Sequence, residues 1–237
     1  MIAEGANHGG EAVHDPLAGA AVVLAGGASE RMGRDKALLE VDGETLLERA
    51  LRGLATMFRE TLVSVGAAGP SAQLSVAVER FERFSEQRVP VVADLVDRGP
   101  LAGIHSVLNA TEWPALFVIA VDLPQLFPPL IHQLWRTAHE PGAIGCIPVF
   151  DGRAHPTYAV YRGELQPALE QRLSDGNLRA QGLAEISGVE ILDLDEEREQ
   201  EALLGETSPA DRVALLHSVF CNLNSPADYD RWRKQQL

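Results

Sequence analysis

Cysteine is scarce in this chain of 237 residues, which contains only Cys146 and Cys221. The two lack the spacing of metal ligands and imply no disulfide framework, so the cytoplasm is the expected location. No apolar run approaches the roughly 18 residues of a membrane-spanning helix, and we expect no membrane association. The segment Met1–Leu17 holds Glu, His, Gly and Asp without a long apolar core, which is unlike a signal peptide.

Basic residues are also few: 20 Lys and Arg stand against 34 Asp and Glu, for a net charge of −14. Broad nucleic-acid binding depends on neutralising many phosphates, so this balance argues against it. A single nucleotide is not excluded, because exposed charges beyond about 10 Å are screened at ordinary salt. A local cluster of Arg31, Arg34 and Lys36, together with a divalent ion, can outweigh the distant acidic surface.

The familiar nucleotide-binding loops are missing too. Gly33 is followed by Arg34-Asp35-Lys36, which is not a Walker A ending, and the glycines do not form G-x-G-x-x-G. Instead the apolar run Ala20–Ala25 ends in Gly26-Gly27, and a loop with Arg31 and Lys36 follows. Glycine lets backbone approach phosphate oxygens, and the cations neutralise their charge. The pattern favours a phosphate-wrapping loop over an ordinary loop with solvated charges.

Short apolar segments alternate with amphipathic ones, which predicts an α/β fold with a largely parallel sheet. The expected strands are Ala20–Ala25, Thr61–Val65, Val89–Ala93, Leu116–Val121, Ile144–Val149, Arg153–Tyr161 (over the pocket) and Val189–Leu194. The expected helices are Thr45–Met57, Leu101–Ala110, Pro128–Ala138 and Glu164–Leu173. We expect one domain over 19–237, after a disordered extension over 1–18. The acidic excursion Asp193–Asp211 is expected to be partly helical at Glu196–Leu204.

Ligands of such sheets sit beyond the carboxyl ends of the strands. Gly26-Gly27, Asp94 and Asp122 each follow a predicted strand directly. With the loop that carries Lys36, four separate stretches of sequence are therefore expected to converge on one edge. Asp122 is the first candidate for a Mg²⁺ ligand, since this ion takes hard oxygen ligands. The alternative for Asp122 is a helix N-cap.

Several motifs, in matching order, resemble those of the molybdenum cofactor guanylyltransferases, a family within the NTP transferases. They are Leu24-Ala25-Gly26-Gly27, Arg31-Met32-Gly33, Asp35-Lys36, Asp94 with Gly99-Pro100-Leu101-Ala102-Gly103, Val121-Asp122-Leu123-Pro124, His155-Pro156-Thr157 and Asn222-Leu223-Asn224-Ser225-Pro226. The opening motif marks the wider superfamily, and the last two narrow the resemblance to the guanylyltransferases. The acidic excursion departs from the family pattern.

The resemblance implies a three-layer, Rossmann-like nucleotidyltransferase fold and a set of roles. Lys36, Arg31 and Asp122 would be catalytic, with Mg²⁺ on Asp122. The nucleotide would contact Leu24, Ala25, Gly26, Gly27, Lys36, Ser64, Asp94 and Asp122. The second substrate, a pterin, would contact His155, Asn222 and Asn224. As alternatives, Asp94, Asn222 and Asn224 are also residues that form turns.

The implied reaction transfers GMP from Mg·GTP to molybdenum-bound molybdopterin and releases pyrophosphate. Transient contact with other cofactor-biosynthesis proteins or recipient molybdoenzymes is also implied. Relatives often carry Asn where this chain has Ser64, so guanine over cytosine stays open. A cytidylyltransferase acting on molybdopterin or on a sugar or polyol phosphate is therefore an alternative. Further alternatives are a nucleotide-binding regulatory protein without turnover, and a protein that docks partners through Asp193–Asp211.

Overall fold

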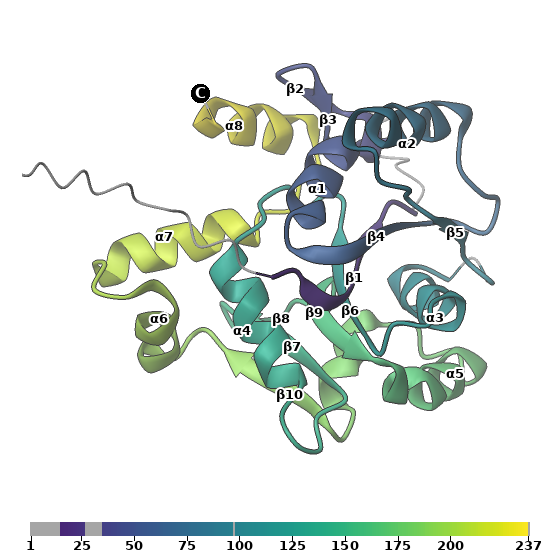
Figure 1. Cartoon of the computed structure of the whole chain (residues 1–237). Coiled ribbons are helices and arrows are strands. Elements are labelled where there is room, and N and C mark those ends of the chain that lie inside the picture. The colour runs from purple at the N-terminus through teal and green to yellow at the C-terminus, as the bar shows by residue number, and fades with distance from the viewer. Residues whose placement is uncertain (1–14, 27–34, 97, 237) are drawn as a thin grey trace, which may run out of the picture.

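The computed structural model describes residues 15–26, 35–96 and 98–236 (Figure 1). Its centre is a sheet with strand order β10-β7-β9-β6-β1-β4-β5, and β8 pairs with β7 alongside this path. The strands are β1 Leu17–Leu24, β4 Phe58–Val65, β5 Val91–Ala93, β6 Ala115–Ala120, β7 Gly145–Phe150, β8 Arg153–Ala154, β9 Tyr158–Arg162 and β10 Val189–Asp193. A separate hairpin joins β2, Glu40–Val41, to β3, Glu44–Thr45.

The two halves of the sheet differ in strand direction. β1 runs parallel to both β4 and β6, β4 runs parallel to β5, and β7 runs parallel to β10. β9 is antiparallel to β6 and to β7, and the short β8 is antiparallel to β7. The predicted α/β class with a largely parallel central sheet is therefore confirmed, with antiparallel pairing confined to the second half.

Helices cover both faces of the sheet and complete the three layers. They are α1 Leu46–Ala55, α2 Ala72–Ser85, α3 Pro100–Ala110, α4 Pro128–Ala138, α5 Gln166–Ser174, α6 Glu197–Leu204, α7 Pro209–Val219 and α8 Pro226–Gln236. Apolar residues of α1, α2, α4, α7 and α8 share one core cluster, and those of α3 and α5 share the other. Figure 1 shows α3 and α5 together on one side of the sheet.

Several helices begin and end where the sequence predicts, for identifiable reasons. Thr45 and Glu48 form a reciprocal capping box at the start of α1, which satisfies backbone N–H groups that the first turn leaves unpaired. Glu48 is buried and also accepts two hydrogen bonds from Arg80 of α2, which ties the two helices together. These bonds lower the pKa of Glu48, although burial acts in the opposite direction. α4 begins at Pro128, as expected for a proline in a first turn.

Two strand predictions need correction. The strand expected at Val89 begins only at Val91, since Pro90 has no N–H for the ladder. The strand expected over Arg153–Tyr161 is wrong as a single element, because it is divided into β8 and β9 by His155–Thr157. Pro156 lies in the interruption, and a loop replaces strand pairing there.

The structure contains helices that periodicity did not predict. α6 at Glu197–Leu204 confirms the helix expected at Glu196–Leu204, but α7 at Pro209–Val219 was not expected. α2 and α8 were not expected either. None of the helices in the described ranges is long and apolar enough to cross a membrane.

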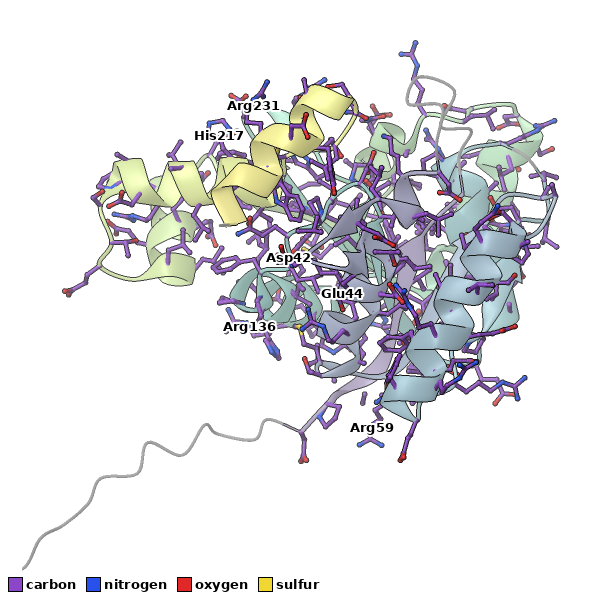
Figure 2. All side chains as sticks on the ribbon, turned by 90° about the horizontal axis from the view of Figure 1, so that it is seen from above. Asp42, Glu44, Arg59, Arg136, His217 and Arg231 are labelled. Atoms are coloured by element: carbon purple, nitrogen blue, oxygen red, sulfur yellow. The ribbon has the colours of Figure 1, made fainter. Side chains whose placement is uncertain are left out.

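The C-terminal helix lies toward the carboxyl ends of the parallel strands. In Figure 2, Arg59 near the amino end of β4 and Arg231 on α8 mark opposite sides of the molecule. His217 of α7 lies on the same side as Arg231. The chain therefore returns to this edge in its last thirty or so residues, which brings Asn222 and Asn224 to the candidate site.

Candidate active site

A cleft of about 540 Å³ opens at the carboxyl ends of the central strands. Its lining includes every predicted site residue that the structure describes: Leu24, Ala25, Gly26, Lys36, Ser64, Asp94, Asp122, His155, Asn222 and Asn224. Two further predicted residues, Gly27 and Arg31, lie outside the described residues. The described residues of this set come from seven separate parts of the chain and meet in one cavity.

The cleft has two walls with a charged centre. We call the residues after β1, β4 and β5 the parallel wall; it consists of Leu24–Gly26, Ser64, Gly66, Asp94, Gly99, Pro100 and Gly103. We call the opposite side the loop wall; it consists of Ala154–Thr157, Leu178–Gln181, Asn222 and Asn224. Asp122 and Lys36 lie between them, since Asp122 follows β6, which separates β1 from β9 in the sheet.

Asp122 and Lys36 form an ion pair at this centre. Lys36 Nζ lies 2.9 Å from Asp122 Oδ2, and the two side chains are 19% and 22% exposed. Lys36 Nζ also donates to Asn224 Oδ1 at 3.0 Å. One cation therefore joins a carboxylate from the end of β6 to an amide from the C-terminal segment.

The backbone around Lys36 fixes where its side chain starts. Asp35 caps the short 3-10 helix Lys36–Leu38, because its carboxylate accepts a hydrogen bond from Ala37 N–H at 3.0 Å. Ala37 is completely buried and anchors the turn in the core. Lys36 is therefore held at the cleft by its neighbours in sequence.

Asp122 is equally well fixed, by residues on either side of it. Val121 and Leu123 are both buried, and Val121 N–H donates to the Leu24 carbonyl at 3.1 Å. The Asp122 carbonyl accepts a hydrogen bond from Leu223 N–H at 2.9 Å. The alternative role as a helix N-cap is not observed, since α4 begins at Pro128 with Phe127 as its N-cap.

The parallel wall is closely packed and depends on glycine. A Cβ on Gly26 would lie 2.8 Å from Gly66 N, so a side chain at this position would displace the neighbouring backbone. Ser64 Oγ donates to Asp94 Oδ1 at 2.9 Å, and a Cβ on Gly103 would lie 2.8 Å from the same hydroxyl. The Asp94 side chain is therefore hydrogen-bonded to the adjacent strand β4, whereas a residue that only forms a turn needs no such partner.

His155 belongs to the loop wall, and its ring packs against the protein. The ring stacks on Phe220 with centroids 4.0 Å apart, and Nε2 is buried without a hydrogen-bond partner among the described residues. Burial lowers the pKa of His155, and Arg153 adds to this effect; a hydrogen bond with the Phe150 backbone and the charge of Asp195 oppose it. The imidazole is therefore neutral near pH 7, and it contributes packing to this wall without adding charge.

Sequence reasoning missed one charged residue of the loop wall, Arg179. It lies between α5 and the 3-10 helix Ala180–Glu185, is exposed, and lines the cleft. An arginine in a polar loop resembles any solvated cation, and no motif among those quoted above includes it. Only the folded chain places it opposite the parallel wall.

The side chains of the cleft suit a magnesium ion that arrives with phosphate groups. No cluster of three or more His, Cys, Asp or Glu residues suited to a metal is found among the residues described. A cation on the Asp122 carboxylate would therefore take its remaining ligands from substrate and water. This is the usual arrangement for Mg²⁺, which is held by one or two carboxylates and substrate phosphates.

A glycine-lined cleft at the carboxyl edge of a mainly parallel sheet, with a lysine and an aspartate at its centre, is suited to binding a nucleotide. A family model for the MobA-like NTP transferase domain matches residues 21–187, more than half of the chain. The chain belongs to this family of nucleotidyltransferases, and the family resemblance seen in its motifs is confirmed.

Curated relatives agree with the family. The chain is 29% identical over 220 residues to a molybdenum cofactor guanylyltransferase of Yersinia pseudotuberculosis, covering 91% of this chain and 95% of the relative. Guanylyltransferases of Yersinia pestis match at the same identity and coverage.

Solved structures share the fold. A molybdopterin-guanine dinucleotide biosynthesis protein A from Archaeoglobus fulgidus matches with a TM-score of 0.68 at 22% identity, covering 92% of this chain and 98% of that chain. A 4-diphosphocytidyl-2C-methyl-D-erythritol synthase from Anaerococcus prevotii matches with a TM-score of 0.57 at 12% identity, covering 84% and 95%. One of these names refers to a guanine dinucleotide and the other to a cytidyl compound, so the shared fold does not determine the base.

Proposed function

We propose that this enzyme transfers GMP from Mg·GTP to molybdenum-bound molybdopterin, forming the guanine dinucleotide cofactor and pyrophosphate. The observation that carries the proposal is the cleft itself, in which Lys36 and Asp122 lie between two different walls. A transferase needs space for two substrates on either side of the reacting phosphate. The names of the curated relatives support the choice of guanine and pterin.

In this proposal GTP lies along the parallel wall and the pterin along the loop wall. Leu24–Gly27 and Ser64 face the base and sugar, with Asp94 beside them. Lys36 and Arg31 contact the phosphates. His155, Asn222 and Asn224 contact the pterin. Glycine at position 26 lets the ends of β1 and β4 approach each other at the cleft, because a Cβ there would lie 2.8 Å from Gly66 N.

The chemistry requires alignment and charge neutralisation, with no proton to remove. The second pKa of a phosphate monoester is near 6, so the acceptor is already an anion at pH 7. One of its oxygens forms a bond to the α-phosphorus of GTP, the bond from that phosphorus to the bridging oxygen breaks, and pyrophosphate leaves. Lys36 reduces the repulsion between the two anions, and the rigid walls hold them in line.

Asp122 is the proposed ligand of Mg²⁺, which would supply positive charge to the phosphate oxygens when bound. The carboxylate would retain the electrostatic support of Lys36, whose ammonium lies 2.9 Å away. A single protein carboxylate leaves the remaining positions of the ion to phosphate and water. Metal and nucleotide are therefore expected to bind together.

A second candidate, cytidylyl transfer, is favoured by one observation, the serine at position 64. The Ser64 hydroxyl donates to Asp94, so this short side chain does not present the two-sided amide that asparagine would offer a base. A cytidylyltransferase acting on molybdopterin or on a sugar or polyol phosphate is the corresponding function.

Nucleotide-dependent stabilisation separates these candidates. The melting temperature would be measured with GTP, CTP, ATP and UTP, each with and without Mg²⁺. A true substrate at a hundredfold excess over its Kd stabilises by about 2.7 kcal/mol, and we expect this only for Mg·GTP. Pyrophosphate release with molybdopterin as acceptor then tests turnover. Preference for CTP would contradict the guanylyl proposal, and tight GTP binding without turnover would indicate a regulatory protein.

A further inference from the structure

Lys36 is held by two acceptors that come from distant parts of the chain. Asp122 Oδ2 lies 86 positions away in sequence and Asn224 Oδ1 lies 188 positions away, at 2.9 and 3.0 Å from Nζ. A lysine side chain is long and flexible, and one acceptor alone would leave its ammonium free to swing. Two acceptors on separate parts of the chain therefore hold the ammonium in one place.

We infer that Asn224 is a positioning residue, which aims the Lys36 ammonium at the triphosphate and so links the C-terminal segment to the nucleotide. The inference rests on the proposed contact between Lys36 and the phosphates. It changes the part given to Asn224, which family resemblance assigns to the second substrate alone. Asn224 then acts on nucleotide binding without touching the nucleotide.

Asn224 can do this because its backbone is anchored at both ends. Leu223 is completely buried, and its N–H donates to the Asp122 carbonyl at 2.9 Å. On the other side, Ser225 Oγ donates to Asp228 Oδ2 at 2.8 Å and accepts from Asp228 N–H, which caps the start of α8. The amide therefore stands on a segment that cannot slide along the cleft.

α8 itself is attached to the part of the chain that carries Lys36. Trp232 is buried, and Arg49 of α1 lies 5.5 Å from the centre of its ring. Tyr229 Oη donates to the Glu40 carbonyl of the β2–β3 hairpin, a few residues after Lys36. The helix thus fixes the distance between Asn224 and the backbone near Lys36.

The amide also has the right charge for this position. A second carboxylate beside Asp122 would attract the ammonium more strongly, but it would repel the triphosphate. The neutral oxygen of Asn224 accepts a hydrogen bond without that penalty. Asn109, an exposed asparagine of α3 that does not line the cleft, provides the matched control.

Binding of inorganic tripolyphosphate, measured by calorimetry in EDTA, tests the inference without base, pterin or turnover. We expect Asn224→Ala to weaken binding about tenfold, because misdirecting one cation by about 1 Å is costly. In a Lys36→Ala background, Asn224→Ala should add less than about twofold, since residues acting as one unit are not additive. Asn109→Ala should stay within about twofold of wild type.

The inference is overturned if Asn224→Ala binds tripolyphosphate as wild type does, or if its effect is as large without Lys36 as with it. Either result would leave the proposed guanylyl transfer intact, because that function is tested by GTP and the pterin. Asn224 is exposed, so we expect the variant to keep the wild-type melting temperature.

A second variant, Asn224→Asp, keeps an oxygen acceptor for Lys36 and adds negative charge. Its binding deficit should shrink as salt rises, since screening weakens charge repulsion, whereas the deficit of Asn224→Ala should shrink less. Equal salt dependence of the two deficits would contradict the inference. This comparison also serves if Asn224→Ala proves unstable.

Discussion

The parallel wall and the loop wall of the cleft are built in different ways. Ser64 and Asp94 stand at or directly after the ends of adjacent parallel strands, and backbone hydrogen bonds join those ends: Ala25 N–H donates to the Ser64 carbonyl at 2.8 Å, and Asp94 N–H donates to the Val65 carbonyl at 2.9 Å. The loop wall instead collects His155, Arg179 and Asn224 from three loops in the antiparallel and C-terminal parts of the chain.

The different construction of the two walls supports the separate binding roles proposed for them. Strand ends in a parallel sheet form a rigid edge, which suits the binding of the nucleotide. Loops carry fewer backbone constraints and vary more easily, which suits a second substrate. Asp122 and Lys36 lie where the two walls meet, so we expect substitutions there to be the most damaging and those in the loop wall to be milder and selective.

The largest expected effect is that of Asp122→Ala, which removes the carboxylate shared by both walls. We expect kcat to fall roughly a thousandfold, as for loss of a main transition-state charge contact. The fold should survive, because Leu223 contacts the Asp122 backbone, which the substitution retains. Steady-state kinetics with varied Mg²⁺ measure kcat, and circular dichroism measures whether the fold is retained. Mg²⁺-dependent activity near the wild-type level would refute the assigned metal role.

Lys36→Ala should have the next largest effect, with kcat falling about a hundredfold. The ion pair with Asp122 is partly exposed, so its loss should change the free energy of unfolding by less than about 1 kcal/mol. Steady-state kinetics and denaturant unfolding of the same variant measure the loss of kcat and the change in unfolding free energy. Comparable damage to stability and to turnover would indicate that Lys36 is structural and that the two walls are joined by other groups.

The parallel wall could be predicted from the sequence more fully than the loop wall. Gly26, Asp94 and Asp122 were predictable because each follows an apolar run, and parallel strands bring such positions to one edge. The motifs, in matching order, identified Lys36 and Asn224 as site residues. They did not predict the hydrogen bond between them, because it joins residues 188 positions apart in the sequence. Arg179 was missed because its role depends on a loop position that only tertiary packing sets.

The fold shows a similar division. The strands β1, β4 and β6 and the helix α1 have strong apolar patterns, and their predicted positions are confirmed to within a few residues. α2 was missed; it carries Val76 and Phe84 exposed, so its apolar face is less distinct than that of α1. The division of 153–162 into two strands depends on Pro156 and on pairing with β7, which a local pattern does not reveal.

Ser64→Ala tests whether the parallel wall acts on nucleotide binding alone. Loss of the 2.9 Å hydrogen bond to Asp94 should raise KM for the nucleotide about tenfold, in line with hydrogen bonds to charged groups, and leave kcat nearly unchanged. Thr61→Val is the matched control, since Thr61 is a buried hydroxyl in β4 whose Oγ1 has no partner among the described residues. A changed KM for the acceptor in Ser64→Ala would contradict the division between the walls.

Arg179→Ala makes the complementary test in the loop wall. Arg179 lines the wall proposed for the pterin, so we expect it to contact the phosphate of the acceptor. Because Arg179 is exposed, this contact should be worth about 1 kcal/mol, so KM for the acceptor should rise about fivefold and KM for the nucleotide should not change. Arg198→Ala removes a cation of α6 that does not line the cleft, and serves as the charge-matched control. An effect confined to the nucleotide KM would place Arg179 with the other wall.

The smallest expected effect is a pH dependence of stability from His155. Burial holds the pKa of this histidine below its ordinary value of 6.5 in the folded chain, with Arg153 contributing and the Phe150 carbonyl and Asp195 opposing. Below pH 6.5 the unfolded chain therefore binds more protons than the folded one, and stability falls as the pH decreases from 7 toward 5. In His155→Gln the slope of unfolding free energy against pH should be shallower in this range.

Phe220→Leu sharpens this test, because it keeps the histidine but removes the ring stacked 4.0 Å from it. Opening the imidazole to water should bring its folded and unfolded pKa values closer, so the slope should lie between those of wild type and His155→Gln. Denaturant unfolding at several pH values measures all three slopes, and only the slopes are compared, since Phe220→Leu lowers stability at every pH. If His155→Gln keeps the wild-type slope, the pH dependence arises from other groups, and the loop wall has no buried neutral histidine acting on stability.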